Sequence, residues 1–150
     1  MDTGDTAWIL ASSALVLLMT PGLAFFYGGM VRAKSVLNMM MMSFIALAIV
    51  PVLWVLYGYS FAFSPGGTSW LGGFERIGLD NITSATAYGT LPEYVFVGFQ
   101  LMLAIITVAL ISGAIADRAK FSAWSVFVVL WMTLVYFPVA HWVFDFGDDG

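Results

Sequence analysis

Four stretches of this chain carry no Asp, Glu, Lys or Arg, and together they make up most of its length. The charge-free stretches are residues 7–31, 35–74, 94–116 and 121–144. A helix needs about 20 predominantly apolar residues to cross the hydrocarbon core of a bilayer, so each stretch is long enough for one crossing. The second is too long for a single helix at about 1.5 Å per residue, and we place its helix within its first part. The pattern predicts an all-α membrane protein, one membrane domain over residues 1–150, with four transmembrane helices near 7–31, 37–63, 94–116 and 121–144. Pro21 and Pro138 predict bends in the first and fourth helices.

The composition excludes a soluble globular domain. The chain is 61% hydrophobic and 9% charged, whereas soluble domains carry about 25% charged residues. Cysteine is absent, which excludes disulfides, thiolate catalysis and cysteine metal sites. The first residues are acidic where a secretory signal has a basic region, so we expect no cleaved signal peptide.

The charges fall unevenly on the two sides of the predicted bundle. Arg32 and Lys34 separate the first two stretches, and Arg118 and Lys120 separate the last two. Arg76 and eight of the nine acidic residues belong to the other side. Short loops rich in Lys and Arg stay in the cytoplasm. We therefore expect the N-terminus and the long segment after the second helix to lie outside, with the two short basic turns inside.

The polar side chains expected at membrane depth include no Asp, Glu, Lys or Arg. No span carries a charge at its centre, which argues against a proton-carboxylate relay, a voltage sensor or a buried ion pair. Gln100 either coordinates a substrate or makes an interhelical hydrogen bond, and the second interpretation is favoured. His141 could carry protons, but an interfacial histidine satisfied by water or backbone is the favoured interpretation.

Aromatic residues gather at the predicted outer ends of the third and fourth helices, where they could form a vestibule or an interfacial belt. The sequence shows no nucleophile–base pair, metal cluster or phosphate-binding loop. We therefore expect no enzyme activity, no cofactor, no metal and no nucleic-acid partner.

Several sequence motifs, in a fixed order along the chain, indicate one family. They are PGLAFFYGG (21–29) followed by MVRAK, WVLYGYS (54–60), GFQ (98–100) with AIIT (104–107), ADRAKFSA (116–123) and YFPVAH (136–141). Over nearly the entire chain this pattern resembles the ammonium transporter family (Amt/Mep/Rh), most closely its bacterial Amt branch. The resemblance implies the N-terminal four-helix portion of an eleven-helix fold, with the N-terminus outside, in a multi-pass protein of the cell (plasma) membrane.

The resemblance also implies roles for particular positions. Phe99 matches an outer vestibule aromatic residue, Leu110 a pore-lining apolar residue, and Phe26 and Tyr27 pore-adjacent residues. In this family the cation is recruited at an outer aromatic site and passes a phenylalanine gate into a narrow hydrophobic channel, which two histidines farther along the chain line.

Two positions depart from the family pattern. Leu103 stands where the family usually places the gate phenylalanine, and Phe144 stands where it usually places the recruiting tryptophan. Phenylalanine offers a weaker cation–π face than tryptophan and lacks the indole donor. Trp142 lies about 200° away round the helix, so it does not substitute for Phe144.

Two functions follow from this reading. The first is ammonium/ammonia transport through a hydrophobic pore, with this chain supplying the outer vestibule and part of the pore wall and incomplete alone. The alternative is a truncated membrane interaction subunit that modulates a full-length transporter. The expected partners are ammonium or ammonia, the lipid bilayer, two further copies in a homotrimer and a cytoplasmic nitrogen-signalling regulator.

Overall fold

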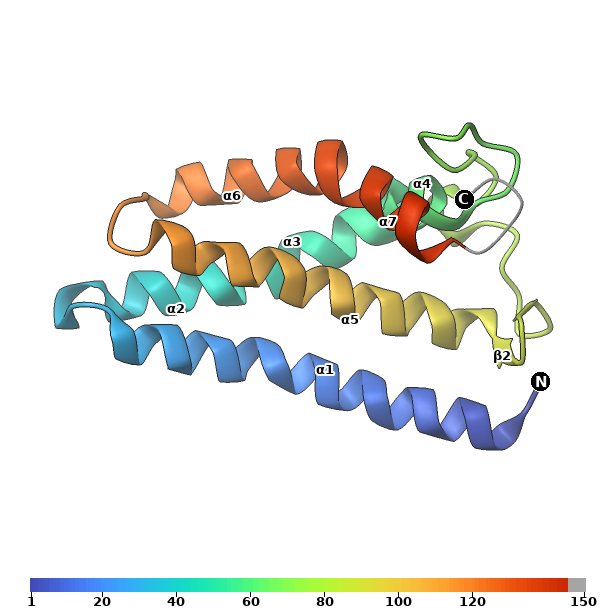
Figure 1. Cartoon of the computed structure of the whole chain (residues 1–150), viewed down its shortest axis with the longest axis horizontal. Helices are drawn as coiled ribbons and strands as arrows, with labels where there is room; N and C mark the ends of the chain where they lie inside the picture. The colour runs from blue at the N-terminus through green and yellow to red at the C-terminus, as the bar shows by residue number, and fades with distance from the viewer. Residues whose placement is uncertain (146–150) are drawn as a thin grey trace.

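Four long helical segments lie side by side along one axis (Figure 1). The computed structural model describes residues 1–145 of the chain. By length and composition, all four segments could cross a membrane. Span 1 is α1 (Thr3–Met30), and span 3 is α5 (Glu93–Ile111) with the 3₁₀ turn η4 (Ser112–Ile115). Span 2 consists of η1 (Ala33–Ser35), α2 (Val36–Phe44), α3 (Ala46–Leu53), η2 (Trp54–Gly58) and α4 (Tyr59–Phe63). Span 4 consists of α6 (Phe121–Trp131), η5 (Met132–Tyr136) and α7 (Phe137–Phe144).

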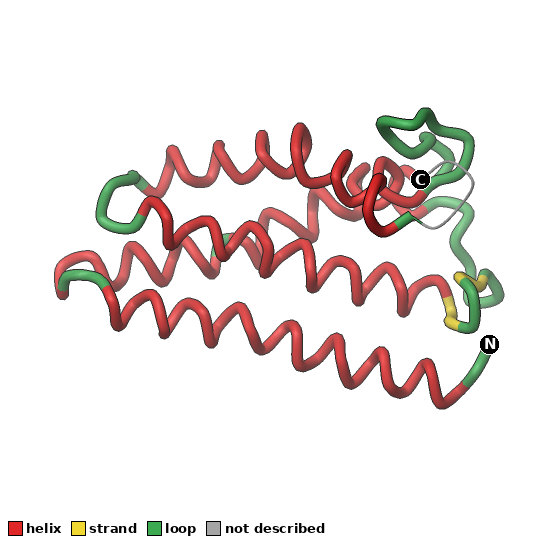
Figure 2. The backbone as a smooth tube through the Cα atoms, in the orientation of Figure 1, coloured by secondary structure: helices red, strands yellow, loops and turns green. Residues whose placement is uncertain are grey.

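The bundle has two unlike ends, which Figure 2 shows as the loop segments at its left and right. The turn end, at the left, carries the short connections between spans 1 and 2 and between spans 3 and 4. The loop end, at the right, carries the N-terminus and the long connection 64–92. This connection contains a short hairpin of β1 (Ala87–Tyr88) and β2 (Leu91–Pro92) and the 3₁₀ turn η3 (Ile77–Leu79).

The first helix begins four residues earlier than the expected residue 7. The side chain of Asp2 accepts a hydrogen bond from the backbone N–H of Asp5 at 2.9 Å. An N-terminal cap of this kind satisfies a donor that the first helical turn leaves free. The Thr90 hydroxyl also donates to the Asp5 carboxylate at 2.7 Å, which ties the start of α1 to the hairpin. Polar capping at the loop end thus extends the helix beyond its charge-free stretch.

Spans 2 and 4 each contain a π-helical turn, η2 and η5. In η5 the N–H of Phe137 bonds to the carbonyl of Met132, five residues earlier. Pro138 follows directly and has no N–H, so the carbonyl of Leu134 cannot receive the ordinary bond from four residues on. The irregularity at Pro138 takes the form of a wider turn just before the proline.

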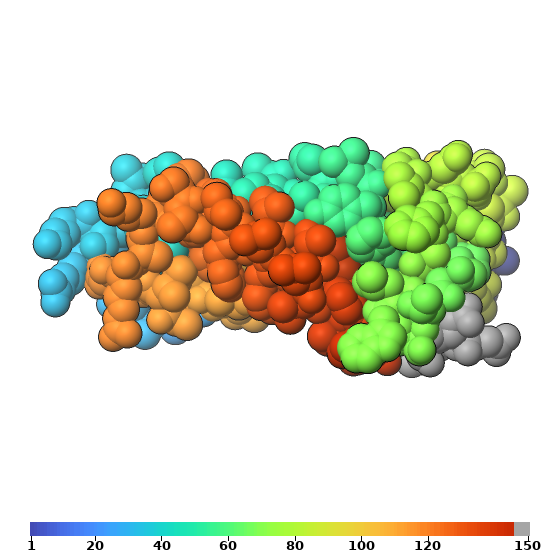
Figure 3. Space-filling view, turned by 90° about the horizontal axis from the view of Figure 1, so that it is seen from above, coloured from blue at the N-terminus to red at the C-terminus, as the bar shows by residue number. Residues whose placement is uncertain are grey.

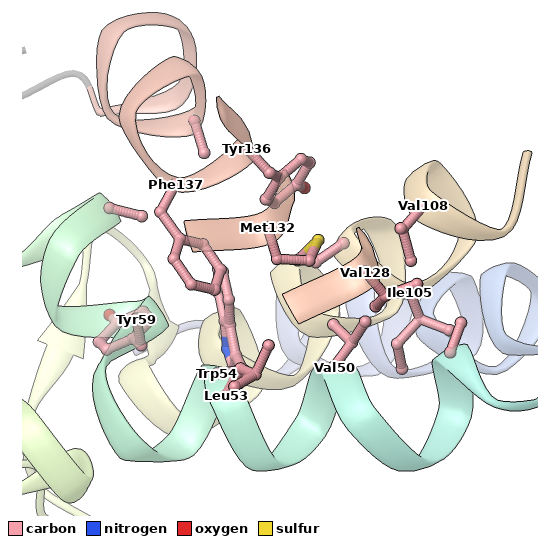
Figure 4. Close-up of a cluster of buried hydrophobic side chains, with 14 of the residues drawn as sticks. Val50, Leu53, Trp54, Tyr59, Ile105, Val108, Val128, Met132, Tyr136 and Phe137 are labelled. Carbon is pink, nitrogen blue, oxygen red and sulfur yellow. The ribbon is translucent and has the colours of Figure 1, made fainter. Parts of the chain in front are cut away.

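The two π turns pack against each other in the core. The Phe137 ring is fully buried and points from α7 toward Trp54, at a centroid distance of 5.9 Å (Figure 4). Gly58 lies directly beneath this ring, where a Cβ atom would come within 2.5 Å of the Phe137 Cζ. The hydroxyls of Tyr57 and Thr133 also hydrogen-bond across the two spans at 2.7 Å.

A buried ion pair closes the loop end, contrary to the expectation from the charge-free spans. Arg76 pairs with Glu93, whose side chain is 2% exposed, and the hydroxyl of Tyr59 donates to the same carboxylate at 2.8 Å. The expectation was drawn from the middle of the spans and is wrong at this end, because Glu93 begins α5 underneath the connection that carries Arg76. Figure 3 shows the first part of this connection, in green, covering the end of the bundle next to α7.

Candidate functional site: a groove between spans 3 and 4

A half-open groove of about 320 Å³ runs between α5 and span 4. Apart from two hydroxyls, its lining side chains are apolar or aromatic. They are Leu103 and Thr107 from α5 and Trp131, Val135, Tyr136, Val139, Val143 and Phe144 from span 4. An apolar passage of this kind admits a small neutral molecule more readily than a hydrated ion.

The groove brings together the two positions that depart from the family pattern. Leu103 and Phe144 both line it, although they are 41 positions apart in the sequence. Phe144 is 36% exposed at the end of α7, so one part of its ring is free of protein contact. The hydroxyl of Thr107 donates to the backbone carbonyl of Leu103 at 2.6 Å and is thereby held at the wall.

A second pocket, of about 400 Å³, lies at the turn end. It is lined by Tyr27, Met30, Val31, Gly113, Ala116 and Asp117. The Tyr27 hydroxyl donates to the Leu110 carbonyl at 3.0 Å. A Cβ atom on Gly113 would come within 2.6 Å of the Tyr27 ring, so the glycine makes room for the tyrosine against span 3.

The α5 positions singled out from the sequence share one face of that helix with Thr107. Phe99, Leu103, Thr107 and Leu110 follow one another at intervals of four, four and three residues, which places them on one side of a helix. Leu110 is 49% exposed near Tyr27. Phe99 is half-buried and lines neither pocket.

Phe26 also stands apart from both pockets. Its side chain is 62% exposed, and its ring lies 5.8 Å from that of the neighbouring Tyr27, centroid to centroid. The structure therefore gathers Leu103 with Phe144 in one pocket and places Tyr27 in the lining of the other. Leu110 lines neither pocket, but its backbone carbonyl accepts the bond from Tyr27, while Phe26 and Phe99 join neither group.

Gln100 and His141 are the two polar residues of the spans for which the sequence left two interpretations open. Gln100 is 7% exposed, and within residues 1–145 its side chain has no hydrogen-bond partner, so the expected interhelical bond is not formed there. The ring nitrogens of His141 lie at hydrogen-bond distance from backbone carbonyl oxygens, as expected, and the side chain is fully buried. The connection 64–92 folds over the end of span 4 and removes this histidine from the surface.

Sequence reasoning missed most of the groove's second wall. Trp131, Val135, Val139 and Val143 recur every four residues along span 4, which is a signal for one helix face. In a membrane helix every face is apolar, so this face does not stand out from those that meet lipid. Only the packing of span 4 against α5 distinguishes it.

Comparisons with known proteins agree with this arrangement. Residues 7–148 match the model of the Ammonium Transporter Family. The chain is similar to an ammonium transporter of Mycobacterium tuberculosis, with 61% identity over 97% of the chain, and to one of Bacillus subtilis, with 49% identity over 100% of it. These alignments cover 34% and 37% of the two relatives, so the chain spans about a third of their length. The crystal structure of Candida albicans Mep2 superposes with a TM-score of 0.87 at 33% identity, covering 100% of the chain and 33% of that protein.

Proposed function

The chain belongs to the ammonium transporter family, and from this premise we propose that it forms one wall of a membrane pore that conducts ammonium nitrogen. The chain is a multi-pass membrane protein with four membrane-length helices. The observation that carries the proposal is the apolar, half-open groove between α5 and span 4, with Leu103 and Phe144 in its lining.

The chemistry of the groove suits this cargo. Aromatic faces attract cations by about 0.5 kcal/mol at exposed sites and about 2 kcal/mol where they are desolvated. A partly exposed Phe144 thus offers a weak recruiting surface at the loop end. Beyond it the lining offers a charged species little beyond the hydroxyls of Thr107 and Tyr136, so a bare ammonium ion would lose its hydration without replacement. The groove therefore favours passage of the nitrogen without its charge.

The orientation belongs to the same proposal. The four cationic residues of the turn end, Arg32, Lys34, Arg118 and Lys120, are exposed and would face the cytoplasm. The loop end with Phe144 would then face outward. This arrangement leaves a basic cytoplasmic surface for a nitrogen-signalling regulator.

Closing the pore requires more protein than the four spans. The groove is open on one side, and the relatives extend well beyond the matched third. We propose that further helices of an eleven-helix transporter cover it and that complete copies associate as a homotrimer. The large apolar side chains exposed along α1, among them Leu15, Leu18 and Phe25, would suit contact with lipid or with another copy.

The test is uptake of ammonium and methylammonium into proteoliposomes. The 150-residue chain is compared with the same chain extended through the helices that its relatives carry, and empty liposomes serve as the control. We expect flux from the extended protein alone. Equal flux from the short chain would refute the requirement for a covering half.

The alternative, a subunit that modulates a complete transporter, makes a different prediction in the same assay. The short chain would conduct nothing itself, would co-purify with a complete transporter, and would change the rate of that transporter when co-reconstituted. Absence of co-purification would exclude this alternative.

A further inference from the structure

His141 lies where three elements of the loop end meet. Its ring is fully buried in α7. The Nδ1 atom lies 3.0 Å from the carbonyl oxygen of Ala62, in the last turn of α4, and the Nε2 atom lies 3.2 Å from the carbonyl oxygen of Thr68, in the connection 64–92. A carboxylate oxygen of Asp145 lies 3.4 Å from the same Nδ1. Within residues 1–145, the polar atoms that lie against the two ring nitrogens are all acceptors.

The two carbonyl oxygens, one at each ring nitrogen, call for two donors from the ring. A neutral imidazole has one N–H donor, and its second nitrogen presents a lone pair. Either neutral tautomer would set that lone pair against a carbonyl oxygen at hydrogen-bond distance. An imidazolium ring donates to both carbonyls at once. Its charge is also favourable at the C-terminal end of a helix, where the carbonyl dipoles leave a partial negative charge.

The other charges nearby do not oppose a cation at this site. The loop segment 64–72 contains no ionisable residue. On α4, Tyr59 interacts electrostatically with Asp145. The Tyr59 hydroxyl also bonds to Glu93, whose negative charge is balanced by the positive charge of Arg76. Among residues 1–145, Asp145 is therefore the charged group that faces the ring directly. A buried cation with three acceptors avoids the penalty of an unpaired buried charge.

The ring is rigidly connected to the groove. Phe144 follows His141 by three residues in the last turn of α7, and that turn is closed by a bond from the Asp145 N–H to the His141 carbonyl at 3.3 Å. On the same turn, Trp142 packs edge-on against Trp70 of the connection at 5.3 Å. The bonds of the imidazole thus hold both the connection and the turn that carries Phe144.

We propose that His141 is a positioning residue, held as an imidazolium that ties the carbonyls of Ala62 and Thr68 together and so sets Phe144 at the mouth of the groove. The inference about Phe144 rests on the proposed transport function. Loss of one proton removes one of the two donors and releases either α4 or the connection from α7.

The first test observes the ring itself and needs no variant. His141 is the single histidine of these 150 residues. In the complete natural polypeptide labelled with ¹⁵N-histidine, its two ring nitrogens are identified by comparison with His141→Gln. We expect both nitrogens to show the chemical shifts of protonated imidazolium near neutral pH. A neutral tautomer under these conditions would overturn the proposal, whatever the transport result.

The second test separates positioning from general stability. His141→Gln keeps one donor but removes the charge and the second bond. The matched control is Tyr57→Phe, which removes the 2.7 Å hydrogen bond to Thr133 between the same two spans, away from the connection. For His141→Gln we expect a several-fold rise in the half-saturating ammonium concentration, with a maximal rate within about two-fold of the wild type.

For Tyr57→Phe we expect both kinetic quantities to stay close to the wild type. The positioning role is overturned if His141→Gln lowers only the maximal rate, or if Tyr57→Phe raises the half-saturating concentration equally. Absence of ammonium flux in the wild type would remove the proposed function and the role at Phe144 with it, while the ring-nitrogen measurement still decides the imidazolium.

Discussion

Replacing Gly58 by alanine probes the closest approach between spans 2 and 4. The added Cβ would lie 2.5 Å from Cζ and 2.7 Å from Cε1 of Phe137. The ring has little room to move, because Trp54 packs on it at 5.9 Å and Tyr57 meets it edge-on at 5.7 Å. The overlap must therefore be relieved by displacing the aromatic cluster or by separating the two spans.

The expected loss of stability follows from two opposing contributions. Carbon atoms pack best at about 3.5–4.0 Å, so the substitution creates an overlap of about 1 Å. Overpacking of a filled core costs about 1–3 kcal/mol. Alanine recovers about 0.5–1 kcal/mol, because it loses less conformational freedom in a helix than glycine does. We expect Gly58→Ala to lower the free energy of unfolding by about 1–2 kcal/mol.

The assay is reversible unfolding in mixed micelles, followed by circular dichroism as the fraction of denaturing detergent rises. The matched control is Gly98→Ala in the interior of α5, where a Cβ would meet no atom within 4 Å. This control should leave stability unchanged or raise it by up to about 1 kcal/mol. Comparison of the two variants isolates the effect of the Phe137 contact from that of helix propensity.

A double-mutant cycle tests the cause directly. In a Phe137→Leu background the clash is absent, so Gly58→Ala should stabilise the protein by about 0.5–1 kcal/mol there, with a coupling energy of about 1–3 kcal/mol. A coupling energy near zero, or a Gly58→Ala variant as stable as the Gly98→Ala control, would refute the reasoning.

Three further predictions concern the loop end and the groove. Arg76→Met leaves the carboxylate of Glu93 buried without its cation, and we expect the free energy of unfolding to fall by about 3–5 kcal/mol. Adding Glu93→Gln should recover part of this loss, and additive effects of the two substitutions would contradict the pairing. Leu103→Phe in the extended protein should change the ratio of ammonium to methylammonium uptake, and unchanged rates for both would remove Leu103 from the gate position. Phe144→Trp should lower the half-saturating ammonium concentration by about two- to five-fold, because a better cation–π face contributes about 0.5–1 kcal/mol at an exposed site. An unchanged half-saturating concentration in the uptake assay would argue against recruitment of the cation at this ring.

Hydrophobic patterning was sufficient for the architecture. A charge-free stretch of about 20 residues favours a helix in a bilayer, because a helix satisfies its backbone polar groups within the segment. The four predicted helices are therefore present in the structure. Hydrophobic patterning did not predict where α1 begins, because the capping residue Asp2 lies outside the apolar stretch. At Pro138 the missing N–H predicted an irregularity, but not that it would take the form of a π-helical turn.

The residues of the candidate site could not be predicted from hydrophobic patterning. The positions of Leu103 and Phe144 came from resemblance to a family, since nothing in the apolar periodicity separates a groove face from a lipid face. That separation is made by the packing of α5 against span 4, which selects Trp131 and the residues that recur every four positions after it.

The amino-acid sequence by itself determined the number of spans, their class and the unequal charge of the two ends, because these depend on local composition and on transfer into lipid. Only the tertiary structure decided the environments of the few polar side chains. The connection 64–92 returns over the bundle, covers His141 with the carbonyl of Thr68 and places Arg76 on Glu93. Such contacts join residues far apart in the chain, so their burial and their charge state depend on how the spans and the connection pack together.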